Sequence, residues 1–177
     1  MFVLYAIPLG LVAGRMIGGR LEGLQRVAIR WGPLALAALV VQILLFSPLA
    51  AGVPDVAARA IYVASTAAVL VAVAANLRLA GVPLVAAGAA ANLAAIVANG
   101  GAMPADPGAL ATAGIALGGP SNSIVSADPL LRPLTDIFAL PAVVPLANVF
   151  SVGDVLIGFG IAIAIAAAMR RGAERHP

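Results

Sequence analysis

Residues 149–169, VFSVGDVLIGFGIAIAIAAAM, form the apolar run that decides the fold class. A helix needs roughly 20 predominantly apolar residues to cross a bilayer, and this run reaches that length with Asp154 as its single charged residue. The whole 177-residue chain is 63% hydrophobic and only 10% charged, whereas soluble domains carry about 25% charged residues. A soluble fold of this size has too little interior to bury so much apolar surface. We therefore expect an integral membrane protein.

Four more apolar segments precede this run. Together they predict an all-α membrane bundle of about five transmembrane helices in a single domain over residues 1–177. Trp31 stands at the start of the second segment, where an aromatic anchor would meet the membrane interface. Residues 14–30 hold four arginines beside apolar positions at helical spacing, which predicts a short amphipathic surface helix. The expected spans are about 1–17, 31–49, 57–77, 82–98 and 149–169.

The charged residues predict the orientation of these spans. If the N-terminus lies outside, the cytoplasmic segments hold eight of the ten basic residues, and the outer segments hold only Arg59 and Arg132. Five of the seven acidic residues fall on the outer side. This distribution follows the positive-inside rule. We therefore expect a protein of the bacterial cytoplasmic membrane with its N-terminus outside and its C-terminus in the cytoplasm.

Residues 99–148 differ in composition and predict an extracytoplasmic segment. Seven of the thirteen prolines fall between Asn99 and Ala147, a density that breaks helices. Asp106-Pro107 is typical of an N-cap followed by a first helical residue, so we expect a short helix up to about Ala116. Residues 137–147 are apolar but too short to span, and they either lie on the membrane or dip into it as a re-entrant segment.

Asn92 and Asn99 are polar residues of the fourth span, seven positions apart and therefore on one helix face. Polar side chains at membrane depth need partners. One interpretation is a small-residue packing face with an amide hydrogen bond to a neighbouring helix. The other is a polar path that leads to a pocket on the outer face.

Two motifs stand at the outer face. Residues 99–104, NGGAMP, form a strong helix stop, or line a pocket with their freed carbonyl groups. Residues 148–154, NVFSVGD, open the last span with Ser151 and Asp154 at the spacing of a capping box.

Asp154 also lies near the expected hydrocarbon boundary, where a carboxylate without a partner is costly. We expect Arg132 or Arg59 to pair with it, because these are the only basic residues of the outer segments. Asp136 would compete for the same arginine.

These features predict an outer-face ligand site. With no cysteine and one histidine, the chain lacks the residues for thiolate, haem or multi-histidine metal sites, and we expect neither metal nor cofactor. A net charge of only +3, without a basic stripe interleaved with aromatic residues, argues against nucleic acid. No catalytic residue is expected. The candidate ligand-binding residues are Asn92, Asn99, Met103, Arg132, Asp136, Asn148, Ser151 and Asp154.

Three functions fit this pattern. The first is binding or transport of a lipid or small molecule through the outer-face site. The second is a structural membrane subunit that packs against a larger partner or a second copy through small-residue helix faces. The third is a membrane-embedded aspartyl hydrolase, since Gly153-Asp154 is similar to part of the Gly-x-Gly-Asp motif of prepilin peptidases and presenilin-like proteases. Ser151 replaces the first glycine, however, and the second acid, Asp136, falls in a loop. Enzymatic activity is thus the least favoured interpretation.

Several motifs together resemble a bacterial family of small multi-pass membrane proteins known only as a domain of unknown function. The resemblance covers nearly the whole chain, and the two outer motifs are its most specific part. It implies the membrane architecture and a role for the outer motifs, but no activity. Relatives tend to carry a Lys-His pair where this chain has Asn122-Ser123, which weakens any catalytic role built on that pair. The matching stretches are 18–21 (GGRL), 76–78 (NLR), 99–104 (NGGAMP), 135–137 (TDI) and 148–154 (NVFSVGD).

Overall fold

The computed structural model describes residues 2–116 and 121–173, and the protein is mostly helical. The α-helices are α1 (Ala6–Met16), α2 (Gly32–Leu45), α3 (Asp55–Ala74), α4 (Val82–Ala98), α5 (Pro107–Ala113) and α6 (Val152–Ala173). Short 3-10 helices are η1 (Phe2–Tyr5), η2 (Leu21–Arg26), η3 (Pro48–Ala50) and η4 (Arg132–Leu134). The strands are β1 (Met103–Ala105), β2 (Ser123–Val125), β3 (Phe138–Ala139) and β4 (Val149–Phe150).

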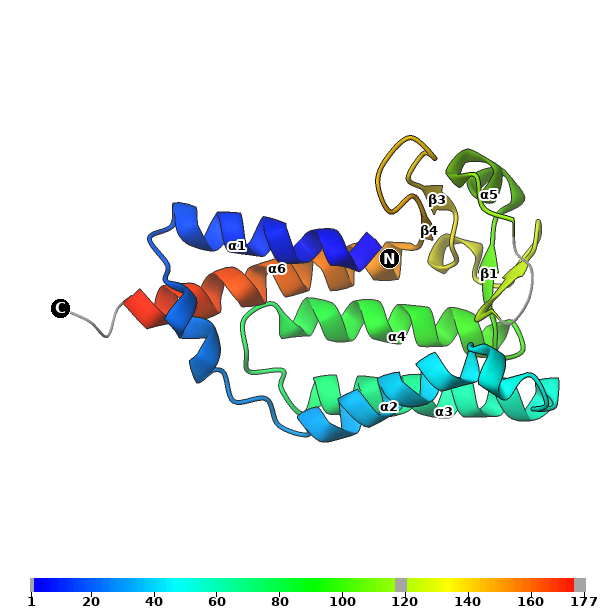
Figure 1. Ribbon diagram of the computed structural model, residues 1–177, viewed down its shortest axis with the longest axis horizontal. Helices are drawn as coiled ribbons and strands as arrows, with labels where there is room; N and C mark the ends of the chain where they lie inside the picture. Colours follow the sequence, from blue (N-terminus) through cyan, green and yellow to red (C-terminus); the bar gives the residue numbers. More distant parts are fainter. Residues whose placement is uncertain (1, 117–120, 174–177) are drawn as a thin grey trace.

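The long helices pack in the order α1, α6, α4, α3, α2. Figure 1 shows α6 between α1 and α4, with α2 lying against α3 on the far side of α4. Helices α1 and α2 therefore stand at the two edges of the arrangement. The chain does not follow this order, because its last helix inserts between the first and the fourth.

Two helices, α3 and α6, are long and apolar enough to cross a membrane, by length and composition. They correspond to the predicted spans 57–77 and 149–169. The other three predicted spans contain shorter apolar helices, Val3–Met16, Gly32–Leu45 and Val82–Ala98. Helix α4 is bounded on both sides by glycine, since Gly81 precedes it and Gly100 follows it, both with positive φ (80° and 71°). The predicted helix stop after residue 98 is therefore confirmed.

Glycine lets the backbones of α4 and α6 touch. A Cβ atom on Gly81 would lie 2.1 Å from the carbonyl oxygen of Gly160, and one on Gly88 would lie 2.3 Å from that of Gly153. Both distances are far below van der Waals contact. The contact between these helices thus depends on residues without side chains, as the small-residue stripes of the sequence indicated.

The expected amphipathic helix over residues 14–30 is wrong in extent. Residues 14–16 are the last turn of α1, and after it only η2, six residues long, is helical, in 3-10 form. Gly18 has φ 78° and ends α1. The backbone N–H of Gly19 donates to the carbonyl of Gly14 at 2.8 Å. Asn76 holds the end of this linker, because its amide accepts from the backbone N–H of Arg30 and donates to its carbonyl, both at 2.8 Å.

The described residues 99–116 and 121–151 lie over one end of the helices, and we call this part of the chain the cap. Its centre is β1, which pairs in parallel with β2 and, through Ala105, with Asp136. Asp106 caps α5 as predicted, accepting hydrogen bonds from the N–H groups of Gly108 and Ala109. The helix ends at Ala113 rather than Ala116, because Gly114 takes the left-handed conformation (φ 66°).

The apolar segment 137–147 belongs to the cap. It begins in β3, which pairs antiparallel with β4. The backbone N–H of Ala142 donates to the carbonyl of Thr112 in α5, at 3.1 Å. The hydroxyl of Tyr5 donates to the carbonyl of Pro145, which ties the segment to the start of the chain. The short strands make the observed fold mostly helical rather than purely all-α.

The charged residues separate between the two ends of the helices. Helices α2, α3, α4 and α6 each run antiparallel to the next in this packing order, whereas α1 runs parallel to α6. Residues 17–31, the turn at 75–81 and the C-terminal end of α6 therefore share the end opposite the cap (Figure 1). Within the described residues, the cap end carries Arg59 and Arg132. The opposite end carries Arg15, Arg20, Arg26, Arg30, Arg78, Arg170 and Arg171.

Candidate functional site

Three predicted site residues, Asn92, Ser151 and Asp154, meet where α4 passes the start of α6. The Asn92 amide donates to Asp154 Oδ1 at 2.9 Å and accepts from the Ser151 hydroxyl at 2.8 Å. The Asp154 N–H donates to Ser151 Oγ at 3.0 Å, and the Ser151 N–H donates to Asp154 Oδ2 at 3.1 Å. The predicted capping box is confirmed, and Asn92 joins it to α4. We call this group the Asn92 lock.

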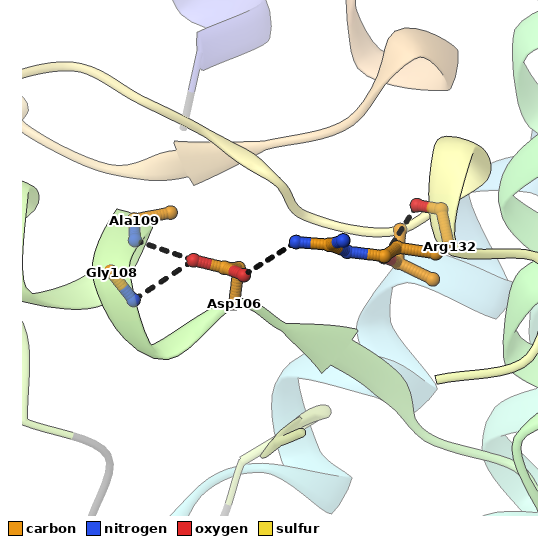
Figure 2. A network of polar contacts seen from close by, with 5 residues as sticks. Asp106, Gly108, Ala109 and Arg132 are labelled. Atoms are coloured by element: carbon orange, nitrogen blue, oxygen red, sulfur yellow. Dashed lines mark hydrogen bonds and ion pairs between the residues drawn. The ribbon is translucent and has the colours of Figure 1, made fainter. Parts of the chain in front are cut away.

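The expected pairing of Asp154 with an arginine is wrong. Arg132 lies 3.5 Å from Asp106 Oδ2, and Figure 2 shows the Asp106 carboxylate between this guanidinium and the N–H groups that begin α5. Arg59 donates to the carbonyl of Gly100 at 3.1 Å. The two oxygens of Asp154 are instead satisfied by an amide and a backbone N–H. Hydrogen bonds to Asn92 and Ser151 therefore take the place of the ion pair that was expected for the Asp154 carboxylate.

The hydrogen bonds around Asp106 lower the pKa of its carboxyl below the usual 3.8. The Ala109 N–H contributes most, and the Gly108 N–H and Arg132 act in the same direction.

Three other predicted site residues are structural parts of the cap. The Asn99 amide clamps the backbone of Leu130, donating to its carbonyl and accepting from its N–H, both at 2.9 Å. Met103 is buried in the apolar core formed with Tyr62. The backbone carbonyl of Asn148 accepts a hydrogen bond from the backbone N–H of Leu140, at 2.8 Å. These residues do not gather into one pocket.

Asp136 is the exception among the buried polar groups. Its residue is only 8% exposed, and its Oδ1 atom is buried without a hydrogen-bond partner. Burial raises the pKa of its carboxyl to about 7, and the nearby Asp154 charge acts in the same direction. A protonated carboxyl is the form that an apolar site favours.

No hydrogen bond joins the carboxyls of Asp136 and Asp154 among the described residues. The two carboxyls therefore do not form a directly hydrogen-bonded pair of the kind that shares one proton, and the hydrolase interpretation stays a prediction. In the part of the chain that is described, no group of three or more His, Cys, Asp or Glu side chains could hold a metal ion.

A hollow of about 120 Å³ opens between the cap and the start of α3. We call it the outer cleft. Its polar lining comes from Asp55, Arg59 and Tyr62 of α3 and from Ser121 and Asn122 of the cap. The Asn122 amide donates to the Tyr62 hydroxyl at 3.2 Å, which closes one side. The remaining wall is formed by Phe46, Ala58, Gly101, Ala102 and Ile124.

The sequence interpretation did not include the outer cleft among its candidate sites. Arg59 was recognised as an outer base and Asn122 as a departure from a family pattern, but their proximity depends on how the cap folds back. Tyr62 could have been singled out from the sequence, since it is the only aromatic residue of the predicted span 57–77.

Most of the chain matches a known protein family. A family of unknown function, DUF5317, matches residues 26–166. The chain belongs to the DUF5317 family. The matched region includes α2 to α5, the cap and most of α6, with the Asn92 lock and the outer cleft inside it. No curated protein and no solved structure matches the chain.

Proposed function

We propose that the protein is a multi-pass protein of the bacterial cytoplasmic membrane, and that its outer cleft binds small molecules bearing both a positive and a negative charge. The N-terminus and the cap lie outside in this proposal, and the C-terminus lies in the cytoplasm. The binding function rests on the outer cleft, and the membrane placement rests on the helices.

Exposed apolar surface supports the membrane placement. Leu9, Leu36, Ile43 and Phe159 belong to α1, α2 and α6, and each is at least 64% exposed. Soluble monomers rarely expose contiguous apolar patches of this kind. The 3-10 helix η1 continues directly into α1, and η3 follows α2 after a short turn, so these two apolar segments extend beyond their α-helices.

Polar contacts inside the bundle point the same way. The Gln42 amide of α2 donates to the Ser65 and Thr66 hydroxyls of α3, at 3.1 and 3.3 Å. Hydrogen bonds of this type join helices within bilayers, where water is absent. The arginines at the end opposite the cap fit a cytoplasmic position under the positive-inside rule. A reporter fused after Pro177 should be active in the cytoplasm, and activity in the periplasm would reject this orientation.

One observation supports the choice of ligand. Asp55 and Arg59 line the same cleft, yet no ion pair among the described residues joins them. Within residues 2–116 and 121–173, the Arg59 guanidinium has one hydrogen bond, to Gly100, whereas a guanidinium offers five N–H groups. A ligand with a carboxylate or phosphate near Arg59 and an ammonium group near Asp55 would satisfy both charges. The volume of about 120 Å³ limits the bound part to a few heavy atoms.

Binding of small probes tests this proposal. In detergent, glycine should give a saturation-transfer NMR signal with the wild-type protein, whereas acetate and methylammonium, each with one charge, should give much weaker signals. Arg59→Gln and Asp55→Asn should each remove the glycine signal. Arg132→Gln is the matched control, because it removes an outer arginine that lies outside the cleft, and it should leave the signal intact.

The same experiment separates two sources of ligand. If glycerophosphoethanolamine binds and glycine does not, the cleft holds a lipid headgroup rather than a free solute. Equal signals from all probes, or a signal that persists in both cleft variants, would reject a charge-paired site.

A second function, that of a structural subunit, is favoured by the state of the predicted site. The Asn92 lock is satisfied internally, and helices α1 and α2 each stand at an open edge. Such edges suit contact with other helices. Mass measurement of the detergent-solubilised protein tests this function, since a stable oligomer or a co-purifying partner would support it and a strict monomer would count against it.

A further inference from the structure

A second hollow lies at the end of the molecule opposite the cap, between α1, η2 and α6. Its volume is about 780 Å³, which lies within the range of ordinary ligand sites. We call it the inner groove. It shares no residue with the outer cleft, and the sequence interpretation assigned it no role.

The mouth of the inner groove carries two guanidinium groups. Arg15 of α1 makes a hydrogen bond of 3.5 Å to the Gly19 carbonyl, at the limit of such contacts. Arg20 lies 3.4 Å from Glu22, and both side chains are more than half exposed (53% and 58%). An exposed pair at this distance contributes little stability, so a stronger anion can replace Glu22 as the partner of Arg20. The groove carries a net charge of one positive unit.

The walls of the inner groove are apolar. Leu11 and Val12 line it from α1, Leu21 from η2 and Met169 from α6. Val12 and Leu21 are each 59% exposed, whereas Met169 is almost completely buried (1%) and forms the floor. Gly19 keeps η2 close to this floor, because a Cβ atom there would lie 2.7 Å from that of Met169. The groove therefore combines a basic mouth with an apolar interior.

We propose that the inner groove binds one anionic phospholipid of the cytoplasmic leaflet. The phosphate would lie between Arg15 and Arg20, and an acyl chain would follow Leu11 and Val12 along α1. Guanidinium groups suit this role because their fixed N–H fork matches phosphate oxygens. Basic pockets between helices on the cytoplasmic side are suited to anionic headgroups. The net charge of the groove selects a lipid with one negative charge over a zwitterionic one. This inference rests on the proposed membrane placement.

The test measures which lipid the purified protein retains. The protein is transferred into mixed micelles with equal amounts of phosphatidylglycerol and phosphatidylcholine, and bound lipid is counted by native mass spectrometry. We expect the wild-type protein to retain phosphatidylglycerol over phosphatidylcholine by about fivefold, the ratio that roughly one favourable charge contact gives. The double variant Arg15→Gln/Arg20→Gln should lose this preference. Arg78→Gln, at the same end but outside the groove, should keep it.

Two further arms decide between explanations. Leu21→Gln changes the apolar wall without changing charge, and it should reduce the amount of lipid retained. Inorganic phosphate at millimolar concentration should not displace the lipid, because the groove binds the acyl chain as well. A wild-type protein without any preference overturns the proposal, and so does an Arg78→Gln variant that loses as much as the double variant.

Failure of the membrane placement gives a different result. Extraction of the protein from membranes by alkaline carbonate would reject the placement itself. A protein that resists extraction but shows no lipid preference would reject only the inner groove.

Discussion

The pH dependence of cap stability should depend on Asp136. Its carboxyl is buried with an unpartnered Oδ1 atom, and burial raises its pKa from 3.8 to about 7, with Asp154 acting in the same direction. A carboxyl that holds its proton more tightly in the folded state gives full stability below the unfolded pKa. That stability is lost as pH rises toward the folded pKa. The cap should therefore become weaker between about pH 4 and pH 7.

The magnitude follows from the two pKa values. A shift from 3.8 to about 7 corresponds to about 4 kcal/mol at 1.36 kcal/mol per unit. Part of this loss has already occurred at pH 5, because the unfolded carboxyl is then mostly ionised. About 2–3 kcal/mol remains to be lost between pH 5 and pH 8. Asp136→Asn keeps the shape of the side chain and removes its charge, so it should remove this slope and stabilise the protein at pH 8.

The assay is unfolding of the protein by a denaturing detergent in mixed micelles, at pH 5 and pH 8. The quantity compared is the change in unfolding free energy between the two pH values. Asp128→Asn is the matched control, because Asp128 is an exposed acid of the same cap, and its slope should equal that of the wild type. If Asp136→Asn and the wild type lose stability in parallel, the buried carboxyl is not the origin of the pH dependence.

Three further substitutions probe the helix contacts and caps. Gly88→Ala places a Cβ atom 2.3 Å from the α6 backbone, and it should lower the thermal midpoint in detergent by an amount equivalent to about 1–3 kcal/mol, whereas Gly52→Ala, in open space, should be neutral. Asp154→Asn replaces one acceptor oxygen by an NH2 group that faces a donor already present in the lock, so we expect a loss of about 1–3 kcal/mol in unfolding free energy and a greater loss of purification yield than Arg78→Gln causes. Asp106→Ala should expose the α5 region to faster hydrogen exchange, and protection of the wild type should persist to pH values below 3.8 because the Asp106 pKa is lowered. Unchanged exchange in α5 would show that the cap does not depend on this carboxylate.

Local signals were predictable from the sequence because their chemistry depends on neighbours in the chain. Ser151 and Asp154 form the expected capping box, Asp106 begins α5, and the glycines after residue 98 end α4. The first two depend on side chains that reach backbone groups two or three residues away, and the third depends on the positive φ that glycine adopts. Composition likewise predicted a mostly helical chain with long apolar helices.

The rest depends on contacts between distant segments. The strands of the cap are two or three residues long, too short for an alternating pattern to appear. Asp154 pairs with Asn92, 62 positions earlier, and not with an arginine. Tyr62 and Asn122 meet across 60 positions in the outer cleft. Chain order gave no indication that α6 inserts between α1 and α4.

The hydrogen bonds of three asparagine side chains have a consequence for how the chain assembles during synthesis. Asn76 binds the backbone of Arg30 as soon as α2 and α3 have formed, so one end of this hairpin is closed before the later helices exist. Asn99 needs residues up to Leu130. Asn92 has to wait for Ser151 and Asp154, which begin the last helix. Until α6 packs beside it, the fourth helix holds an unsatisfied amide, so the Asn92 lock closes after the contacts that Asn76 and Asn99 make.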